Sequence, residues 1–182
     1  IDNLLYNSTV PANQPAAPSV YGFNEKLKPI DYDPERAKQL LREAGYPDGF
    51  EFVLETSIGS SANADAVNQV TAQYLNNIGV KMIIRAIPVN QLIRNVIEGT
   101  WNGDAFGIHY SFQPTAEALK ALDTHSCLWP KAWYCKEEIM PTLRAAQIEF
   151  DREKNIELRK EIMAYYRNDW ASIFMYQAPR FT

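Results

Sequence analysis

The chain has 182 residues, of which 46% are hydrophobic and 22% are charged, a composition typical of a soluble globular domain with a full apolar core. The formal net charge is −4 and the Lys and Arg residues are scattered. This excludes a large basic surface of the kind that nucleic acids and anionic membranes require. The chain starts at Ile1 without an initiator Met, so we expect a processed or excised piece whose lack of a signal peptide says nothing about compartment.

An extended lead-in is predicted for residues 1–31, because Pro, Asn, Ser and Ala dominate and no period is sustained. The stretch "YDPERAKQLLREAGYPDGFEFVL" (32–54) then predicts a helix and a strand. Asp33 is a good N-cap, Pro34 suits the first helical position, and Gly45 ends the helix. Apolar and other residues alternate from Phe50, as expected of a strand.

Helices and strands continue to alternate toward the middle of the chain. A second helix is predicted before Gly79, a strand at 80–87 before Pro88, and a third helix before Gly99. The alternation in "DAFGIHYSF" predicts a third strand at 104–112. Helices that alternate with strands over short connections predict an α/β fold whose sheet is largely parallel.

The pattern becomes helical after Pro114. We predict a short helix at 115–123, a helix that begins near Met140, and a last helix at 152–170 capped by Asp151. The charged run "DREKNIELRKE" is interpreted as a solvated helix face, and "SIFMYQAP" as a closing strand.

Cys127 and Cys135 lie close together in "SCLWPKAWYC", and three interpretations are open. A zinc site with His125 would lack a fourth ligand. Two free thiols would fit a cytosolic protein. A local disulfide is the favoured interpretation, and it would imply an oxidising compartment.

Ligands of open α/β sheets bind beyond the carboxyl ends of the strands. The predicted ends carry Ser57 and Gly59 after the first strand and residues 109–113 after the third, and none resembles a phosphate-binding loop. Trp129 and its aromatic neighbours either line a ligand cleft or pack the cysteine loop against the sheet.

Catalysis is not indicated by the sequence. Ser111, His109 and Asp104 would lie on one strand, whereas the members of a catalytic triad converge from different elements. We therefore expect no catalytic residues, no metal and no cofactor.

The order of these motifs resembles the family-5 extracellular solute-binding proteins, the dipeptide, oligopeptide and nickel receptors of ABC importers. The resemblance rests on the 32–54 stretch, on "YLNNIGVKMIIRAI", on "GTWNGDAFGIHY", on the lead-in "VPANQPAAP" and on the closing "DREKNIELRKEIMAYYRNDWASIFMYQ". It covers nearly the whole chain.

The resemblance implies that residues 1–182 form one α/β lobe, the C-terminal ligand-binding lobe of a two-lobed periplasmic-binding-protein-like (type II) fold, with a mixed, mostly parallel sheet flanked by helices. The expected partners are a peptide or small-molecule ligand, the permease subunits and a missing N-terminal lobe, with no nucleic acid. The resemblance also implies a disulfide between Cys127 and Cys135. It implies a periplasmic or extracellular location, where a membrane-anchored lipoprotein is one possible form. The alternative is a cytosolic α/β enzyme or regulatory domain with only architectural likeness.

One departure from the family concerns the ligand. Peptide receptors carry, after the third strand, an Asp that pairs with the peptide α-amine, whereas "HYSFQPTAEALKAL" has only Glu117 as an acid. A neutral set of hydrogen-bonding and aromatic residues is left, which favours a sugar conjugate or a modified peptide; the alternative is that the absent lobe supplies the acid. The predicted ligand-binding residues are Ser57, Gly59, His109, Tyr110, Ser111, Phe112, Gln113, Trp129 and Tyr176.

Overall fold

The computed structural model describes residues 10–58, 63–109, 117–123 and 126–177. It divides into two compact units, which are described separately. Unit 1 contains the described residues of 6–30 and 110–182, and unit 2 those of 31–109. Whether residues 1–182 make one lobe, as the sequence predicts, stays a prediction.

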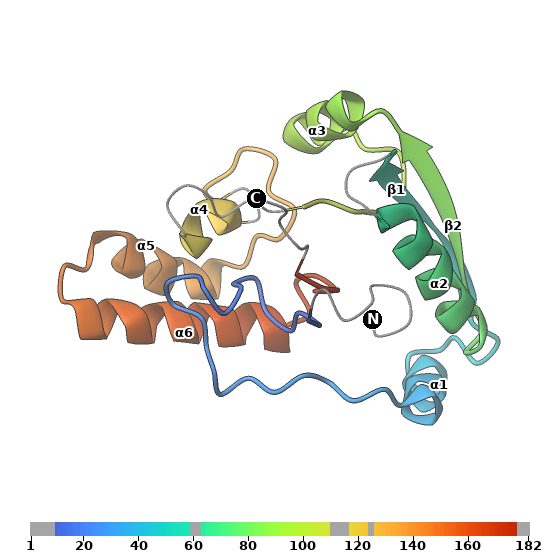
Figure 1. Ribbon diagram of the computed structural model, residues 1–182, viewed down its shortest axis with the longest axis horizontal. Coiled ribbons are helices and arrows are strands. Elements are labelled where there is room, and N and C mark those ends of the chain that lie inside the picture. The colour runs from blue at the N-terminus through green and yellow to red at the C-terminus, as the bar shows by residue number, and fades with distance from the viewer. Residues whose placement is uncertain (1–9, 59–62, 110–116, 124–125, 178–182) are drawn as a thin grey trace. The chain divides into compact units, whose positions relative to one another are not determined.

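Unit 2 is built on a parallel sheet with the strand order β2-β1-β3. Figure 1 shows β1 and β2 side by side. The central strand β1 (Phe50–Ser57) pairs along its full length with β2 (Val80–Ile87), from Phe50 opposite Val80 to Ser57 opposite Ile87. On its other side β1 pairs with β3 (Ala105–Phe106). Helix α2 (Ala64–Asn76) packs against β2, and α3 (Val89–Glu98) packs against β1. The parallel α/β architecture is as the sequence predicts.

The first helix of unit 2, α1 (Pro34–Glu43), begins and ends as its sequence predicts. The Asp33 carboxylate accepts the backbone N–H of Arg36 at 2.9 Å, and Pro34 occupies the first turn. None of the residues of α1 is buried within unit 2. Helix α3 ends at Gly99, also as predicted, with a left-handed backbone conformation.

The third strand is shorter than predicted. Alternation indicates a strand over 104–112, but β3 is only Ala105–Phe106, and 107–109 form neither helix nor strand. Residues 110–112 lie outside the described part of the chain. Alternation is not sufficient for a strand, because a strand also needs a partner backbone, and β1 ends at Ser57, two positions beyond its last residue paired with β3.

The amino end of the sheet combines tight turns with exposed aromatic residues. A Cβ atom at Gly49 would lie 1.8 Å from the carbonyl oxygen of Gly79, so the two turns before β1 and β2 touch only because no side chain stands there. Tyr46 and Phe50 are exposed, and their ring centroids are 5.2 Å apart.

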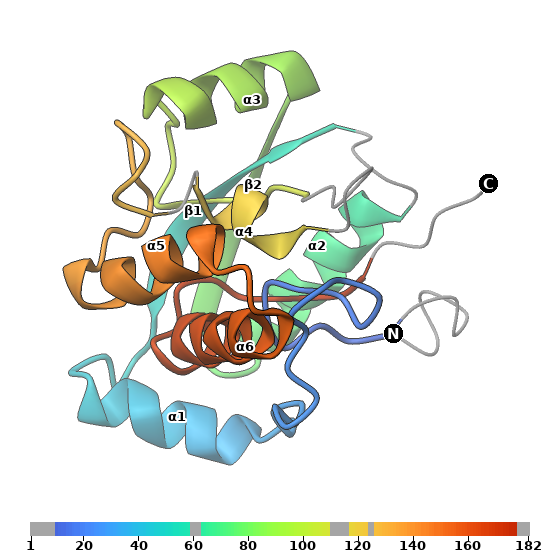
Figure 2. The same cartoon turned by 90° about the vertical axis from the view of Figure 1, so that its left-hand side faces the viewer.

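Unit 1 is helical. It contains α4 (Ala118–Asp123), a 3₁₀ turn η1 (Glu137–Ile139), α5 (Met140–Ile148) and α6 (Arg152–Asn168), with α5 and α6 side by side (Figures 1 and 2). Helix α5 begins at Met140, as Pro141 predicts, and the Asp151 carboxylate caps α6 by accepting the backbone N–H of Glu153 at 3.0 Å.

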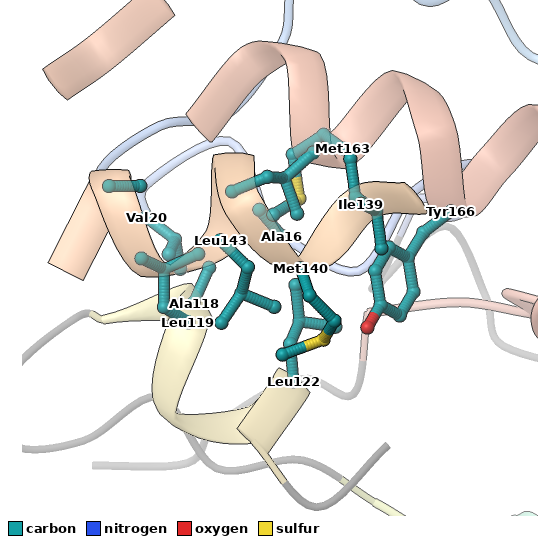
Figure 3. Close-up of a cluster of buried hydrophobic side chains, with 12 residues drawn as sticks. Ala16, Val20, Ala118, Leu119, Leu122, Ile139, Met140, Leu143, Met163 and Tyr166 are labelled. Carbon is teal, nitrogen blue, oxygen red and sulfur yellow. The ribbon is translucent and has the colours of Figure 1, made fainter. Parts of the chain in front are cut away.

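The apolar core of unit 1 draws on every one of these helices (Figure 3). Its buried residues are Ala16, Val20, Ala118, Leu119, Leu122, Ile139, Met140, Leu143, Ala146, Ile162, Met163 and Tyr166. Two of them, Ala16 and Val20, come from the lead-in. The lead-in is irregular, as predicted, but it also contributes to the core.

The closing segment of the chain is not a full strand in its described part. Tyr176 forms a single antiparallel bridge with Pro11, and the N–H of Ala12 donates to the carbonyl of Met175 at 3.2 Å. The predicted closing strand is therefore reduced to one bridge among residues 172–177.

Candidate functional site

The carboxyl edge of the sheet in unit 2 is lined by buried polar groups. Glu55, Thr56 and Ser57 end β1, and each is at most 5% exposed. Ser57, which the sequence predicts to bind ligand, is 3% exposed. Ile58 follows, exposed, and its N–H donates to the carbonyl of Ile87 at 2.9 Å.

Glu55 is the centre of a hydrogen-bond network that the sequence does not predict. One carboxylate oxygen accepts the side-chain amide of Asn95 on α3 at 3.0 Å, and the other accepts the backbone N–H of Asn102 at 3.1 Å. The guanidinium of Arg85, the β2 residue in register with Glu55, donates to the carbonyl of Asn102. We call these four residues the Glu55 network.

A second set of contacts holds the segment before β3 against β1. The N–H of Asp104 donates to the carbonyl of Val53 at 2.9 Å, and its carboxylate accepts the N–H of Val53 at 2.8 Å. A Cβ atom at Gly103 would lie 2.9 Å from that same carbonyl. The motif "WNGD" therefore lies directly against the central strand, which only a glycine at position 103 permits.

His109 is the last described residue of unit 2. It is exposed over part of its surface, and desolvation of the rest lowers its pKa below the usual histidine value. The imidazole is therefore neutral at pH 7 and can both donate and accept a hydrogen bond. Four other predicted ligand-binding residues, Tyr110, Ser111, Phe112 and Gln113, lie outside the described residues, as does Gly59.

The cysteine loop belongs to unit 1, and it is closed by a disulfide between Cys127 and Cys135. The predicted pairing is confirmed. Cys127 and Tyr134 pack against the apolar core, and the rings of Tyr134 and Tyr166 are 5.1 Å apart. Trp129, predicted to contact the ligand, is half-buried in this loop.

The end of the cysteine loop is attached to the end of α6. The hydroxyl of Tyr134 donates to the carboxylate of Asp169, and the ammonium of Lys136 lies 3.3 Å from the same carboxylate. The hydrogen bond from Tyr134, followed by the one from Lys136, lowers the pKa of Asp169 below the ordinary aspartate value of 3.8. Burial, followed by the bond to Asp169, raises the pKa of Tyr134.

Arg159 on α6 is buried, which corrects the interpretation of "DREKNIELRKE" as a wholly solvated face. Its guanidinium forms an ion pair with Glu117 and donates to the side-chain oxygen of Asn155. It also lies over the ring of Tyr21, 4.8 Å from the centroid. The signal in the sequence is spacing: Asn155, Arg159 and Ile162 fall on one helix face, so the charged run carries the start of a buried stripe.

Unit 1 also contains Tyr176, a predicted ligand-binding residue, and an open groove. Tyr176 is half-buried at its bridge with Pro11. An open groove runs along α5 and α6 between charged residues, among them Lys26, Glu149 and Lys154, and no predicted site residue lines it.

The described residues offer neither a metal-binding cluster nor a membrane-spanning helix. They contain no group of three or more His, Cys, Asp or Glu side chains that could hold a metal ion. Within the same ranges, no helix has both the length and the apolar character needed to cross a bilayer.

Residues 1–126 match the family model described as "Bacterial extracellular solute-binding proteins, family 5 Middle". The chain belongs to this family. The resemblance read from the 32–54 stretch and from "GTWNGDAFGIHY" is thereby confirmed, since both stretches lie within the matched residues.

Among curated proteins of this family, the chain is similar to the glutathione-binding protein GsiB of Salmonella typhimurium. The two are 35% identical over 162 residues, which cover 83% of this chain and 31% of that protein. The chain therefore spans about a third of the length of this relative.

Solved structures show the same fold. HbpA2 from Haemophilus parasuis aligns over 97% of this chain and 36% of its own, with a TM-score of 0.81 and 18% identity. The oligopeptide-binding protein AppA from Bacillus subtilis, in complex with a nonapeptide, aligns over 97% and 39%, with a TM-score of 0.78 and 20% identity. The predicted periplasmic-binding-protein-like fold, a parallel sheet flanked by helices, is confirmed.

Proposed function

We propose that the chain is the C-terminal lobe of a two-lobed receptor that serves an ABC importer. The receptor captures a peptide or related small solute outside the cytoplasmic membrane and delivers it to the permease subunits. It binds without turnover, so the chain has no catalytic role. The observation that carries this proposal is the match of residues 1–126 to the family of extracellular solute-binding proteins.

A periplasmic or extracellular location supports the same function, whether or not the full protein carries a lipid anchor. Structural disulfides persist in oxidising compartments and are rare in the cytosol. The Cys127–Cys135 bond therefore fits a protein that works outside the cytoplasmic membrane.

The solute is proposed to be a peptide-like compound whose α-ammonium is not held by this chain's segment after β3. The only acid in residues 109–122, Glu117, is already paired with Arg159, and its carboxylate also accepts the N–H of Leu119 at 2.9 Å. An ammonium group taken out of water without a partner carboxylate costs several kcal/mol, so such a group would have to bind elsewhere in the receptor. His109, neutral at pH 7, fits a ligand with hydrogen-bonding groups.

Glutathione is a suitable first test compound, because GsiB is named as a glutathione-binding protein. It is a modified peptide, joined through a side-chain carboxyl, and so falls within the class that the sequence favours. The predicted contact residues are part of the proposal: Ser57, Gly59, His109, Tyr110, Ser111, Phe112, Gln113, Trp129 and Tyr176.

The test is a thermal-shift screen of the full-length protein with glutathione, ordinary di- and tripeptides, their N-acetylated forms and sugar–amino acid conjugates. The proposal expects stabilisation by glutathione or a conjugate, which rises with ligand concentration by mass action. A large stabilisation by unmodified peptides that acetylation abolishes would contradict the proposed ligand class. No response to any solute would contradict the receptor function.

A further inference from the structure

Glu55 has an unusual place for a carboxylate, at the carboxyl end of the central strand. It is 2% exposed, and both of its oxygens accept hydrogen bonds, from Asn95 and from Asn102. Burying a carboxylate costs free energy that an apolar side chain of the same size would not cost. If the side chain at this position only filled space in the sheet, leucine or valine would stabilise the fold more than glutamate. The distinctive contribution of Glu55 is therefore the geometry that its hydrogen bonds impose on Asn95 and Asn102.

That geometry is imposed on Asn102. Its N–H is bound to the Glu55 carboxylate and its carbonyl to the Arg85 guanidinium, so the peptide units on both sides of Asn102 are fixed by charged side chains. The next two residues are fixed as well, because Gly103 and Asp104 lie against the backbone of Val53. The connection from α3 to β3 therefore has one defined path.

The path continues to the predicted ligand-binding residues. The backbone carbonyl of Glu55 accepts the N–H of Gly107 at 2.8 Å, so the side chain of Glu55 fixes the start of the 102–107 segment and its backbone fixes the end. His109 follows two residues later. Because the segment is short, a shift of Asn102 would be carried along it to His109.

We infer that Glu55 is a positioning residue for ligand binding: its buried carboxylate holds the 102–107 segment so that His109 meets the solute in a fixed place. Glu55 itself touches no ligand in this account. The inference rests on the proposed function, and it extends that function to a residue at which the sequence pattern indicates only an ordinary strand position.

The test compares Glu55→Gln with two control variants in the full-length protein. Glutamine keeps the size of the side chain, but its NH₂ group would face a donor, so one of the two hydrogen bonds is lost. Glu51→Gln is the matched control, because Glu51 lies on the same strand and the same face but is exposed and paired with Lys81. Val96→Ala is the stability control, since it removes two buried methyl groups from α3 and none of the hydrogen-bonding groups of the network.

Affinity for glutathione, measured by calorimetry well below the melting temperature, is the main measurement. We expect Glu55→Gln to weaken binding about tenfold, which corresponds to the loss of about one hydrogen bond to a charged group. Glu51→Gln should bind as the unaltered protein does. Val96→Ala should lower the melting temperature but leave the affinity within about twofold. A Glu55→Gln variant that loses stability but keeps its affinity, as Val96→Ala does, would overturn the inference.

Hydrogen exchange gives a readout that needs no ligand. In Glu55→Gln, the Asn102 amide should show the largest rise in exchange rate, because it loses its bond to the carboxylate. The Gly107 amide should also exchange faster, to a smaller degree, because a loosened segment weakens its bond to the backbone of Glu55. Unchanged exchange at both amides would also overturn the inference. If the unaltered protein binds none of the solutes in the screen, the proposed function fails and the ligand role of Glu55 fails with it, whereas faster exchange would still establish the network as a structural constraint.

Discussion

The two units of the chain differ in the size of their apolar cores and in where their buried polar side chains lie. Unit 1 is organised around a cluster of apolar residues from the lead-in and all of its helices. In the described part of unit 2, the buried apolar residues are Ala64, Val80, Leu92 and Val96, beside the buried polar end of β1. Unit 1 has the larger apolar core and also buries polar side chains on α6, among them Asn155 and Arg159. In unit 2 the buried polar side chains lie at the end of β1, where open α/β sheets bind ligands.

The sharpest test of this contrast is one substitution made in both units. Leu143 on α5 is 0% exposed, and Leu40 on α1 is 48% exposed. We expect Leu143→Ala to lower the free energy of unfolding of the 182-residue chain by about 2–5 kcal/mol, because it leaves a cavity in a close-packed core. Leu40→Ala should cost less than about 1 kcal/mol. Urea denaturation measures both, and equal losses would remove the distinction between the units.

Arginine replacements extend the contrast to charged groups. Arg159→Met removes a guanidinium that is 7% exposed and leaves Glu117 and Asn155 without their donor. The expected loss is about 2–3 kcal/mol. The control is Arg36→Met, since Arg36 pairs with Glu43 on the surface of α1, and its loss should cost less than about 1 kcal/mol. Similar midpoints of urea denaturation for the two variants would show that the ion pair of Arg159 contributes no more to stability than a surface ion pair.

Such buried polar groups mark the limit of what the sequence predicts. The helix ends could be predicted, because Asp33, Pro34, Pro141 and Asp151 act within one turn of their own position. The disulfide could be predicted from the closeness of the two cysteines together with the family resemblance. These features depend on neighbours along the chain or on a shared family pattern.

The burial of Glu55 and Arg159 could not be predicted in the same way. Glu51 and Glu55 occupy equivalent positions in an alternating strand, yet only Glu55 is covered, because α3 packs against that end of β1. Arg159 lies in a run of charges, and its partners Tyr21 and Glu117 are distant in sequence. For the candidate site, the sequence predicts the strand ends, but the Glu55 network required the structure.

The disulfide provides a smaller effect within unit 1. Replacing both Cys127 and Cys135 by Ser removes a cross-link between residues eight positions apart. The chain-entropy relation gives a loss of about 2–3 kcal/mol for a loop of this size. We expect the lower part of this range, because Asp169 also holds the end of the loop next to Cys135. Urea denaturation of the oxidised and the reduced chain measures the contribution of the disulfide to the free energy of unfolding. The double Ser variant is the reference without a cross-link. A reduced chain as stable as the oxidised one would contradict the prediction.

The smallest expected effect is a pH dependence at the end of α6. The pKa of Asp169 is lowered in the folded chain, so the bonds from Tyr134 and Lys136 contribute fully above its ordinary pKa of 3.8. That contribution is lost as the pH falls through the lower folded value. Asp169→Asn should therefore reduce stability at pH 7 and have little effect at acid pH. A variant that is equally destabilised at both pH values would exclude an electrostatic cause.

The central claim is that this chain is one lobe of a solute receptor, and a calorimetric comparison tests it most directly. The affinity of a solute identified by the screen, glutathione first, is measured for the full-length protein and for the 182-residue chain. A two-lobed receptor takes its affinity from both walls of the cleft, so we expect binding by the chain alone to be weaker by about a hundredfold or more. Equal affinity of the two proteins would contradict the account.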